Sequence, residues 1–370
     1  MMAARFITQT FPAMSAASPS PASPPRASGP RPDAALIAAL EAAHYHPLWD
    51  RYQRITPPLP KAADVPMHWR WRNFEPYVAR AATEVPIADI ERRAIIMVNP
   101  AFGGATTTTS NLLGAFTVLN PGDRAPPHRH TAAAIRFATL AEGAFTIVNG
   151  RRCAMREGDL VLTPSMCWHG HINQSDQVTT WFDAANMPLV CGLDASFFEP
   201  GSRSAEAFWE VDEGEERRWA APALTPLPEA RPTVQSAGAQ SPKYHYPGVQ
   251  TRALLDGAQP AADGSRRLRY LNPETGGAVM PALDCYAMRV VAGAATQAQR
   301  GTWNQICLVV SGSGRSTVGS HTFDWQQHDV FTIPHWKWAS HQAADGAADF
   351  FIVTDRSLYE LLGLAREEAQ

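Results

Sequence analysis

Short runs in which apolar and polar residues alternate follow one another from about residue 93 to the end of the chain. Typical runs are AIIMVNP, AFTVLNPGD and AIRFATLAEG, each ending in residues that favour turns. A two-residue period places one face of a strand against a core, and many short strands with regular turns are typical of a sandwich or a barrel. The pattern therefore predicts a mainly all-β fold.

The N-terminal part of the chain follows two other patterns. Residues 1–33 are rich in Ser, Pro and Ala, and they bury too little surface to offset the entropy of ordering, so we expect a disordered N-terminal extension. From 32 to about 52, apolar residues recur at three- and four-residue spacing behind Asp33 as N-cap, which predicts a helix; a second helix is expected over 75–82. We predict a helical arm over 34–92 that serves in packing or in contacts between subunits.

An internal repeat divides the β-rich region. The segment GDLVLTPSMCWHGH (158–171) aligns with HDVFTIPHWKWASH (328–341) at an offset of 170 residues, with Asp, apolar residues, Pro and Trp in step. A repeated β unit predicts two related barrels, which we place at 93–218 and 243–370. A Pro-rich polar stretch over 219–242 is predicted to link them.

Composition and charge narrow the class of protein. The 370 residues are 45% hydrophobic and carry a formal net charge of −3, which argues against nucleic acid or an anionic membrane as a partner. No apolar run is long enough to span a bilayer, and the N-terminus lacks the pattern of a secretory signal. The five cysteines are scattered and form no CxxC pair, so we expect a reduced, cytoplasmic protein.

Candidate chemistry begins in the segment HRHTAAAIRF. His128, His130 and Arg136 have the same parity, so on one regular strand they would share a face, and alanines between them would leave room inside a barrel. Two imidazoles at i and i+2 can converge on one metal ion. His169 follows a Gly-Asp strand and is expected to supply a third ligand from an antiparallel neighbour. The alternative is three hydrogen-bonded core histidines.

Arg136 extends this hypothesis to a substrate. Three neutral imidazoles without a carboxylate leave the metal charge uncompensated and leave coordination positions open. The planar guanidinium of Arg136 suits a carboxylate, although a protein carboxylate is the alternative partner. We expect a metal that binds a small carboxylic acid. Fe(II) fits imidazoles with open positions, and Zn, Mn, Ni and Cu are alternatives that the ligands alone leave open.

These spacings resemble the two sequence motifs of the cupins, which are small jelly-roll barrels that hold a metal in the barrel mouth. Residues 122–143 resemble the first motif and residues 158–173 the second, in the expected order. One departure is that Ala134 and Ile135 stand where the first motif usually has a glutamate.

A wider resemblance is to the gentisate 1,2-dioxygenase family, a bicupin group that includes salicylate and 1-hydroxy-2-naphthoate dioxygenases. It covers nearly all of the chain after about residue 40. The segments that carry it are ERRAIIMVNP, PGDRAPPHRHTAAAIRF, GDLVLTPSMCWHGHIN, TWFDAANMPLV and LRYLNPETGGAVMP. The resemblance implies two jelly-roll β-barrels behind an N-terminal helical arm. It also implies Fe(II)-dependent insertion of O2 between the carboxyl-bearing and the adjacent hydroxyl-bearing carbon of an aromatic acid, with gentisate giving maleylpyruvate.

The resemblance assigns roles to individual residues. A histidine beside the ligands would act as general acid and base near the substrate hydroxyls, and an acidic residue would support the site from the next strand. The matching positions are His128, His130 and His169 for the iron, Arg136 and Arg92 for the substrate, and His171 and Asp183 for the two supporting roles. For the last two, the alternative is a plain hydrogen-bonded pair.

Three departures from the family pattern bear on the substrate. Thr117, which we expect to line the substrate site, and Ala132 stand where the family often has glutamine, and Asn186 replaces an acidic residue. The smaller or neutral groups lead to the hypothesis of a pocket for something other than gentisate. Gentisate remains the default substrate. Salicylate, a substituted salicylate such as 5-nitrosalicylate, or 1-hydroxy-2-naphthoate are the alternatives.

The second barrel lacks the ligand set. Gln299, Gly301 and Ala339 match the three metal positions, so we expect no metal there, and His341 at the place of His171 is expected to be structural. This domain is predicted to act as scaffold and interface, because members of the family are usually homo-oligomers, commonly tetramers. Two other functions compete with ring cleavage: a metal-dependent cupin isomerase or decarboxylase, and a non-catalytic cupin that binds an aromatic acid.

Overall fold

The computed structural model describes residues 33–201, 223–226 and 239–370, which fall into two compact units divided between Pro58 and Leu59. The predicted N-terminal extension lies outside these residues apart from Asp33. Among the described helices, none combines the length and the apolar character needed to cross a membrane.

The smaller unit contains two short helices, α1 (Ala34–Ala42) and α2 (Leu48–Ile55). The single helix expected over 32–52 is therefore wrong. His44 adopts a left-handed φ of 61° after α1, and Pro47 precedes α2 in an extended conformation, so the helix cannot run through. Asp33 precedes α1, but its carboxylate accepts a hydrogen bond from Trp49 Nε1 (2.9 Å) instead of capping the helix.

The larger unit begins with a segment that contacts both of the β-barrels that follow it. Strand β1 (His68–Trp69) pairs with β20 of the second half, and α3 (Trp71–Glu84) then packs against β3 of the first. The rings of Trp71 and Phe74 lie 5.1 and 5.3 Å from that of Phe116. Helix α3 is longer than the predicted 75–82 because its aromatic first turn is also buried against the barrel.

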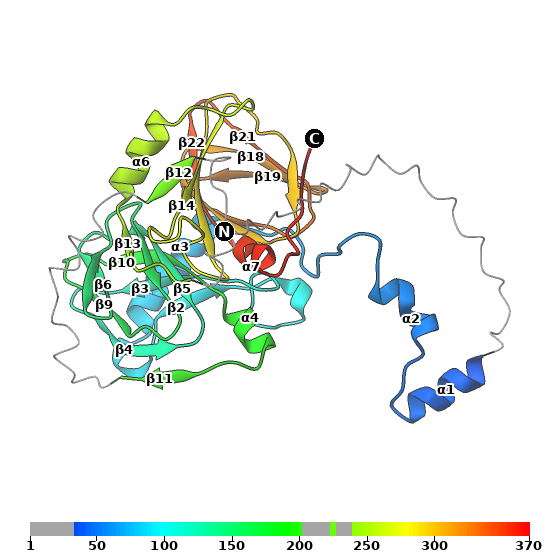
Figure 1. The fold of residues 1–370 in the computed structure, drawn as a ribbon. Helices are drawn as coiled ribbons and strands as arrows, with labels where there is room; N and C mark the ends of the chain where they lie inside the picture. Colours follow the sequence, from blue (N-terminus) through cyan, green and yellow to red (C-terminus); the bar gives the residue numbers. More distant parts are fainter. Residues whose placement is uncertain (1–32, 202–222, 227–238) are drawn as a thin grey trace, which may run out of the picture. The chain divides into compact units, whose positions relative to one another are not determined.

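The first barrel consists of two antiparallel sheets (Figure 1). One has the order β13-β8-β5-β10-β3-β2 and the other β11-β4-β9-β6-β7. Its strands are β2 (Ala94–Met97), β3 (Leu113–Leu119), β4 (Arg124–His130), β5 (Ala134–Leu140), β6 (Ala144–Val148), β7 (Arg151–Ala154), β8 (Leu160–Thr163), β9 (His169–Asn173), β10 (Thr179–Ala185), β11 (Phe198–Pro200) and β13 (His245–Tyr246). Short 3-10 helices at Ile87–Asp89 and Pro100–Phe102 flank β2, and helix α4 (Met187–Gly192) precedes β11.

The second barrel repeats this arrangement at offsets of 169 to 171 residues. The first matching pair of strands is β3 and β15, and the last is β11 and β23. Its sheets have the orders β1-β20-β17-β22-β15-β14-β12 and β19-β18-β21-β16-β23. Its elements are β12 (Leu224–Pro226), α6 (Gly248–Gly257), β14 (Ser265–Tyr270), β15 (Asp284–Val290), β16 (Gln299–Gly301), β17 (Gln305–Ser311), β18 (Ser313–Val318), β19 (His321–Gln326), β20 (Val330–Ile333), β21 (Ala339–Ala343), β22 (Ala348–Thr354), α7 (Arg356–Leu361) and β23 (Glu367–Ala369).

Local sequence explains the turns of these barrels. The hairpin between β6 and β7 turns at Asn149-Gly150, which have φ values of 47° and 78°. Both residues of such a two-residue turn need a positive φ, which Asn tolerates and Gly adopts without strain. The predicted all-β bicupin fold is confirmed.

The two barrels share strands and core. Residues 224–226, within the predicted linker, form β12 in the sheet of the second barrel, while β13 after the linker joins the first barrel beside β8. The rings of Phe137 and Phe351 stack at 4.2 Å within one buried cluster that draws residues from both barrels. Apolar strand faces from each barrel therefore bury one another. Residues 219–222 and 227–238 of the predicted linker lie outside the described ranges.

Truncating this shared core should destabilise the whole larger unit. Phe351 is 1% exposed. Phe351→Ala is expected to lower the free energy of unfolding by about 3–5 kcal/mol, because it removes buried apolar surface and leaves a cavity. Denaturant unfolding followed by tryptophan fluorescence measures this change. Replacing exposed Leu140 of β5 with alanine is the control, and a similar loss in both variants would contradict the shared core.

Candidate metal centre and active site

Three histidines converge inside the first barrel. His128 and His169 lie opposite each other on the neighbouring strands β4 and β9, and His130 ends β4. Ring centroids are 4.4 Å apart for His128 and His169, 5.0 Å for His130 and His169, and 5.2 Å for His128 and His130. The nitrogens available as ligands lie within 4.8 Å of one another. The spacing expected for a metal site is thus present in the fold.

Hydrogen bonds fix the tautomers of two of these rings. His130 Nδ1 lies 2.7 Å from the carbonyl oxygen of Ala132, and His169 Nδ1 lies 3.0 Å from that of Cys167. A carbonyl can only accept, so each Nδ1 carries the proton and each Nε2 presents a lone pair. His169 Nε2 is buried and has no hydrogen-bond partner. A divalent metal ion is the group that this orphaned lone pair fits.

The electrostatics of the pocket keep the imidazoles neutral. Burial lowers the pKa of His128 to about 2, with further lowering by the charge of Arg92. Burial lowers the pKa of His130 to about 4, followed by the effect of Arg136, and it holds that of His169 well below its ordinary value. Neutral imidazole is the form that coordinates metals, so His130 and His169 present lone pairs at neutral pH. The ring of His128 is neutral too, but its nitrogens face Arg92 Nη2, which lies 2.6 Å from Nδ1 and 3.1 Å from Nε2.

Arg136 lies on β5, directly opposite Asp183 on β10. Its Nε is 3.3 Å from Asp183 Oδ1, and its Nη1 donates a hydrogen bond to the hydroxyl of Thr163. The side chain is 7% exposed, and among the described residues Nε lacks a hydrogen-bond partner because the contact with Asp183 has ion-pair geometry only. The alternative of a protein carboxylate beside Arg136 is therefore found, but one donor stays unused.

The segment that begins with His128 is two strands and not one. Residues 131–133 are not part of a strand, and they separate β4 from β5, which belong to different sheets. His130 and Arg136 nevertheless both reach the interior, because each strand turns one face to the inside of the barrel. The expectation of one continuous strand is corrected.

Asp183 is held by its neighbours and not by His171. The hydroxyl of Thr117 donates to Asp183 Oδ2, and Trp181 Nε1 donates to Oδ1 at 3.1 Å. Burial raises the pKa of Asp183, and the charge of Arg136 lowers it. Thr117 is 3% exposed, so the structure places its hydroxyl on a protein carboxylate and not towards open space for a substrate.

His171 lies beside the histidine cluster on β9, with its ring centroid 6.0 Å from that of His169. Its Nδ1 is 2.8 Å from the hydroxyl of Thr146 on the adjacent strand β6, and its ring lies 5.3 Å from that of Trp181. The alternative of a hydrogen-bonded pair with Asp183 is not found. With Nδ1 engaged, Nε2 is the ring nitrogen left for chemistry.

Arg92 adds a second cation at the same centre. Its Nη2 lies 2.6 Å from His128 Nδ1, and its Nη1 donates to the carbonyl of Pro126 at 3.2 Å. Burial and then repulsion by Arg136 lower its pKa to about 9. Two guanidiniums around one carboxylate, Asp183, leave the centre with an excess of positive charge, which an anionic ligand would offset.

The sequence analysis missed two supporting residues, Thr163 and Thr146, and the contact of a third, Asn186. Thr163 holds Arg136, Thr146 holds His171, and the carboxamide of Asn186 accepts from the backbone N–H of Ala133 at 2.8 Å, fixing the turn between β4 and β5. One signal was present for Thr146, because the repeat has another hydroxyl residue, Ser316, at the corresponding place. Asn186 was noticed only as a missing charge, and its contact depends on the fold.

Removing the hydroxyl of Thr117 should weaken substrate binding through Asp183. Thr117→Val keeps the shape of the side chain and deletes the hydrogen bond, so KM for the aromatic acid should rise about 10-fold, the usual effect of one hydrogen bond to a charged group. Thr117→Ser should restore it, with metal content unchanged in both. Steady-state kinetics and metal analysis measure this, and a normal KM in Thr117→Val would contradict the role.

Comparisons with known proteins agree with this geometry. A sequence profile described as Cupin domain matches residues 115–185. The chain is 34% identical to the 5-aminosalicylate 1,2-dioxygenase of Comamonas sp. over 90% of both chains. It is 35% identical to the gentisate 1,2-dioxygenase of Streptomyces sp. over 90% of this chain and 94% of the relative. The solved salicylate 1,2-dioxygenase of Pseudoaminobacter salicylatoxidans, with gentisate, superimposes with a TM-score of 0.82 at 32% identity, covering 93% of this chain and 96% of that one.

The fold and the site define a bicupin oxidoreductase that incorporates both atoms of O2. The chain belongs to the gentisate 1,2-dioxygenase family of ring-cleaving dioxygenases.

Proposed function

We propose that His128, His130 and His169 hold Fe(II), and that the protein opens the ring of a gentisate-type aromatic acid between the carboxyl-bearing and the hydroxyl-bearing carbon. The buried, unpartnered lone pair of His169 Nε2 carries this proposal. Bound there, the metal supplies Lewis-acid polarisation and a template for an ortho-hydroxy acid and O2. Imidazole ligands that leave coordination positions open favour Fe(II) among the divalent metals used with O2 to oxidise organic substrates.

The side chains of the barrel divide the remaining work. The guanidinium of Arg136 binds the substrate carboxylate, and Arg92 adds positive charge at the same centre. Asp183 orients Arg136, and Thr117 acts on the substrate through Asp183. His171, held at Nδ1 by Thr146, moves a proton at Nε2 between the site and the substrate hydroxyl.

The substrate is gentisate by default, with maleylpyruvate as the product, and 5-substituted salicylates as the second candidates. Relatives named for gentisate and for 5-aminosalicylate have similar identity to this chain. Thr117 and Asn186 are both occupied with protein partners, so neither brings a free charge to the substrate. The absence of a charged residue at these two positions is compatible with different groups at the ring position opposite the ortho-hydroxyl.

An oxygen electrode tests the proposed reaction. Fe(II)-loaded protein is offered gentisate, salicylate, 5-aminosalicylate, 5-nitrosalicylate and 1-hydroxy-2-naphthoate, and one O2 should be consumed per ring opened. Turnover without O2 would favour an isomerase or a decarboxylase. Binding of the acids without any O2 uptake would favour a non-catalytic binding protein. Gentisate turnover far above that of every salicylate would exclude the altered-pocket hypothesis.

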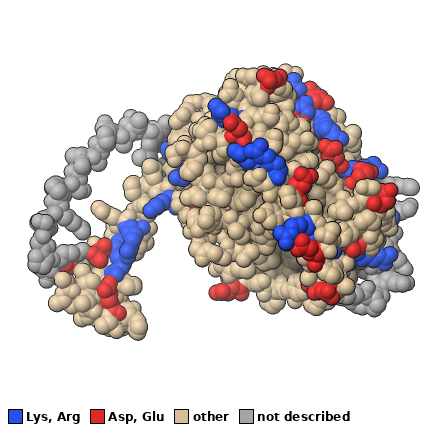
Figure 2. All heavy atoms as spheres, turned by 180° about the vertical axis from the view of Figure 1, so that it is seen from behind, with Lys and Arg blue, Asp and Glu red and all other residues tan. Residues whose placement is uncertain are grey.

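We propose further that the protein works as a cytoplasmic homo-oligomer, a tetramer by family. All five cysteines are free, as expected in a reducing compartment. Figure 2 shows acidic and basic side chains interspersed over one face of the larger unit, without the single-sign field that binds nucleic acid. Helix α2 carries four large hydrophobic residues that are each 54–61% exposed: Leu48, Trp49, Tyr52 and Ile55. A partner subunit would cover them.

Deleting residues 1–58 should therefore lower the oligomeric state and leave a folded larger unit. The deleted part forms its own compact unit, so the barrels keep their contacts. Light scattering after size-exclusion chromatography measures the mass. The double variant Leu48→Ser/Ile55→Ser should give the same smaller species, and an unchanged mass in both proteins would contradict the interface.

A further inference from the structure

The second barrel contains a cavity of about 100 Å³ at the place that corresponds to the metal centre of the first. Gln299 and Ala339 line it at the positions of His128 and His169. The position of His130 is Gly301, where any side chain would collide with the indole of Trp303. The space is large enough for several water molecules or for one small organic molecule. The second barrel thus lacks the three histidines of the first barrel but has a cavity at the corresponding place.

Arg267 lines this cavity, and its guanidinium keeps one donor without a hydrogen bond. Its Nη1 donates to Gln299 Oε1 at 2.5 Å, and its Nη2 lies 3.5 Å from a carboxylate oxygen of Asp263. Its Nε is buried and has no hydrogen-bond partner. A buried donor on a charged group is costly when it stays unpaired, so an acceptor on a ligand would be bound favourably.

His341 lines the same cavity. Its Nδ1 lies 2.8 Å from Ser316 Oγ, which accepts a hydrogen bond from Trp325 Nε1 at 2.8 Å. With Nδ1 engaged by Ser316, Nε2 is the ring nitrogen left for a ligand. Burial lowers the pKa of His341 to about 3, so the ring stays neutral. No protein acceptor is hydrogen-bonded to this Nε2 in the described part of the chain.

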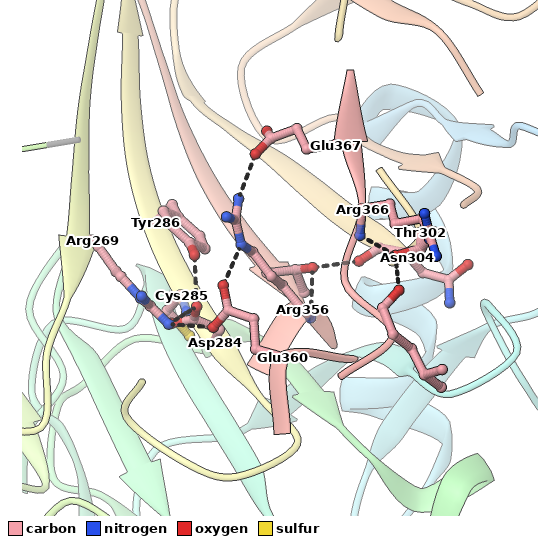
Figure 3. Close-up of polar contacts among 12 residues, drawn as sticks. Arg269, Asp284, Cys285, Tyr286, Thr302, Asn304, Arg356, Glu360, Arg366 and Glu367 are labelled. Carbon is pink, nitrogen blue, oxygen red and sulfur yellow. Dashed lines mark hydrogen bonds and ion pairs between the residues drawn. The ribbon is translucent and has the colours of Figure 1, made fainter. Parts of the chain in front are cut away.

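Two of the other three cations on the cavity wall already have carboxylate partners. Figure 3 shows Arg356 between Glu360 and Glu367, next to the cluster of Arg269 with Asp284. Arg300 pairs with Glu368 of the C-terminal strand.

The charges and the apolar walls specify the kind of ligand. Four cations line the cavity against one acid, Glu367: Arg267, Arg300, Lys337 and Arg356. The remaining wall is apolar and includes Met288, Ile333, Ile352 and the ring of Trp303. Donors at one side and apolar surface around them match a flat molecule with one carboxylate.

We propose that the cavity of the second barrel binds a small aromatic carboxylate, held by the guanidinium of Arg267 and the ring of His341, as a ligand site separate from the metal centre. The proposal is independent of the reaction in the first barrel, because no residue of that barrel takes part. The duplicated domain then has a binding function of its own.

Equilibrium dialysis of the metal-loaded full-length protein against radiolabelled benzoate tests the proposal. Benzoate lacks the hydroxyl that ring cleavage needs, so it is bound and not consumed. We expect two equivalents per chain in the wild type, one in each barrel. Arg136→Gln should lose the equivalent in the first barrel and keep the other.

Two variants address the second site by different means. Arg267→Met removes the free donor and should weaken the second equivalent about 10- to 100-fold, and Asp263 stays satisfied by Ser265 and by the N–H of Gln297. Ala339→Leu fills the cavity without changing a charge, so it should abolish the second equivalent and retain the fold. Arg315→Met, which alters an exposed arginine of the same barrel that is absent from the cavity wall, is the matched control.

The outcomes separate the two sites. An equivalent that survives Arg136→Gln and disappears in Arg267→Met and Ala339→Leu supports the proposal, whether or not the first barrel binds benzoate. A single equivalent that is lost in Arg136→Gln and unchanged in the two cavity variants overturns it. If Arg315→Met weakened benzoate binding as much as Arg267→Met, the proposal would also be overturned. The loss would then follow from the lower positive charge of the barrel and not from the cavity.

Discussion

Replacing His169 with alanine is expected to weaken Fe(II) binding by more than about 100-fold, beyond the loss usual for residues that merely support a metal ligand. The reason is the geometry of its ring. Nδ1 is fixed on the carbonyl of Cys167, and Nε2 is buried without a partner, so the protein offers that lone pair to nothing but a bound ion. Iron content after anaerobic reconstitution and dialysis measures the change.

The control for this variant is another buried histidine. His341→Ala removes a neutral imidazole that is 7% exposed and lies two residues after the position matching His169, in the second barrel. It should leave the iron content at the wild-type level. Normal iron in His169→Ala, or equal loss in both variants, would show that the metal is held elsewhere.

Replacing Arg136 with glutamine is expected to retain iron and to lower kcat/KM for the aromatic acid by about 100-fold. The guanidinium is buried, and its unpaired Nε is the donor best placed for a carboxylate. A hydrogen bond between charged groups contributes about 1.5–3 kcal/mol, and each 1.4 kcal/mol is a factor of ten. Kinetics together with direct binding of the substrate under anaerobic conditions measures this loss.

Arg129→Gln is the matched control, because Arg129 lies between His128 and His130 and pairs outward with Glu199 at 2.6 Å. It should leave kcat/KM unchanged. Since Arg136→Gln also leaves buried Asp183 without its cation, the double variant Arg136→Gln/Asp183→Asn should recover thermal stability and not activity. Recovery of activity in the double variant would mean that Arg136 serves only to neutralise Asp183.

Much of the site could be predicted because its signals are local. The period-two alternation and the turn residues indicated the barrels, and the spacing of His128, His130 and His169 indicated a metal site. These features depend on the chain geometry of strands and on ligand chemistry, which a sequence shows directly. The repeat between 158–171 and 328–341 likewise predicted the second barrel.

The failures concern contacts that need long-range packing. The helix over 32–52 breaks at His44, and residues 224–226 became a strand because an edge of the second sheet was open to them. That Thr117 lines the substrate site stays a prediction, and only the fold shows that its hydroxyl donates to Asp183. Propensity and motif spacing carry no information about which buried group finds which partner.

By itself, the sequence determined the chemical inventory: three imidazoles, two guanidiniums and the duplicated strand pattern that carries them. Only the tertiary structure decided how these groups are used. Antiparallel pairing between distant strands brings Arg136 to Asp183 and His128 to His169. Exclusion of water then makes the imidazoles neutral and leaves Arg136 Nε, His169 Nε2 and Arg267 Nε without a hydrogen bond among the described residues. Burial is a property of the whole fold, which is why the free donors and acceptors that define both sites appear only when the chain is folded.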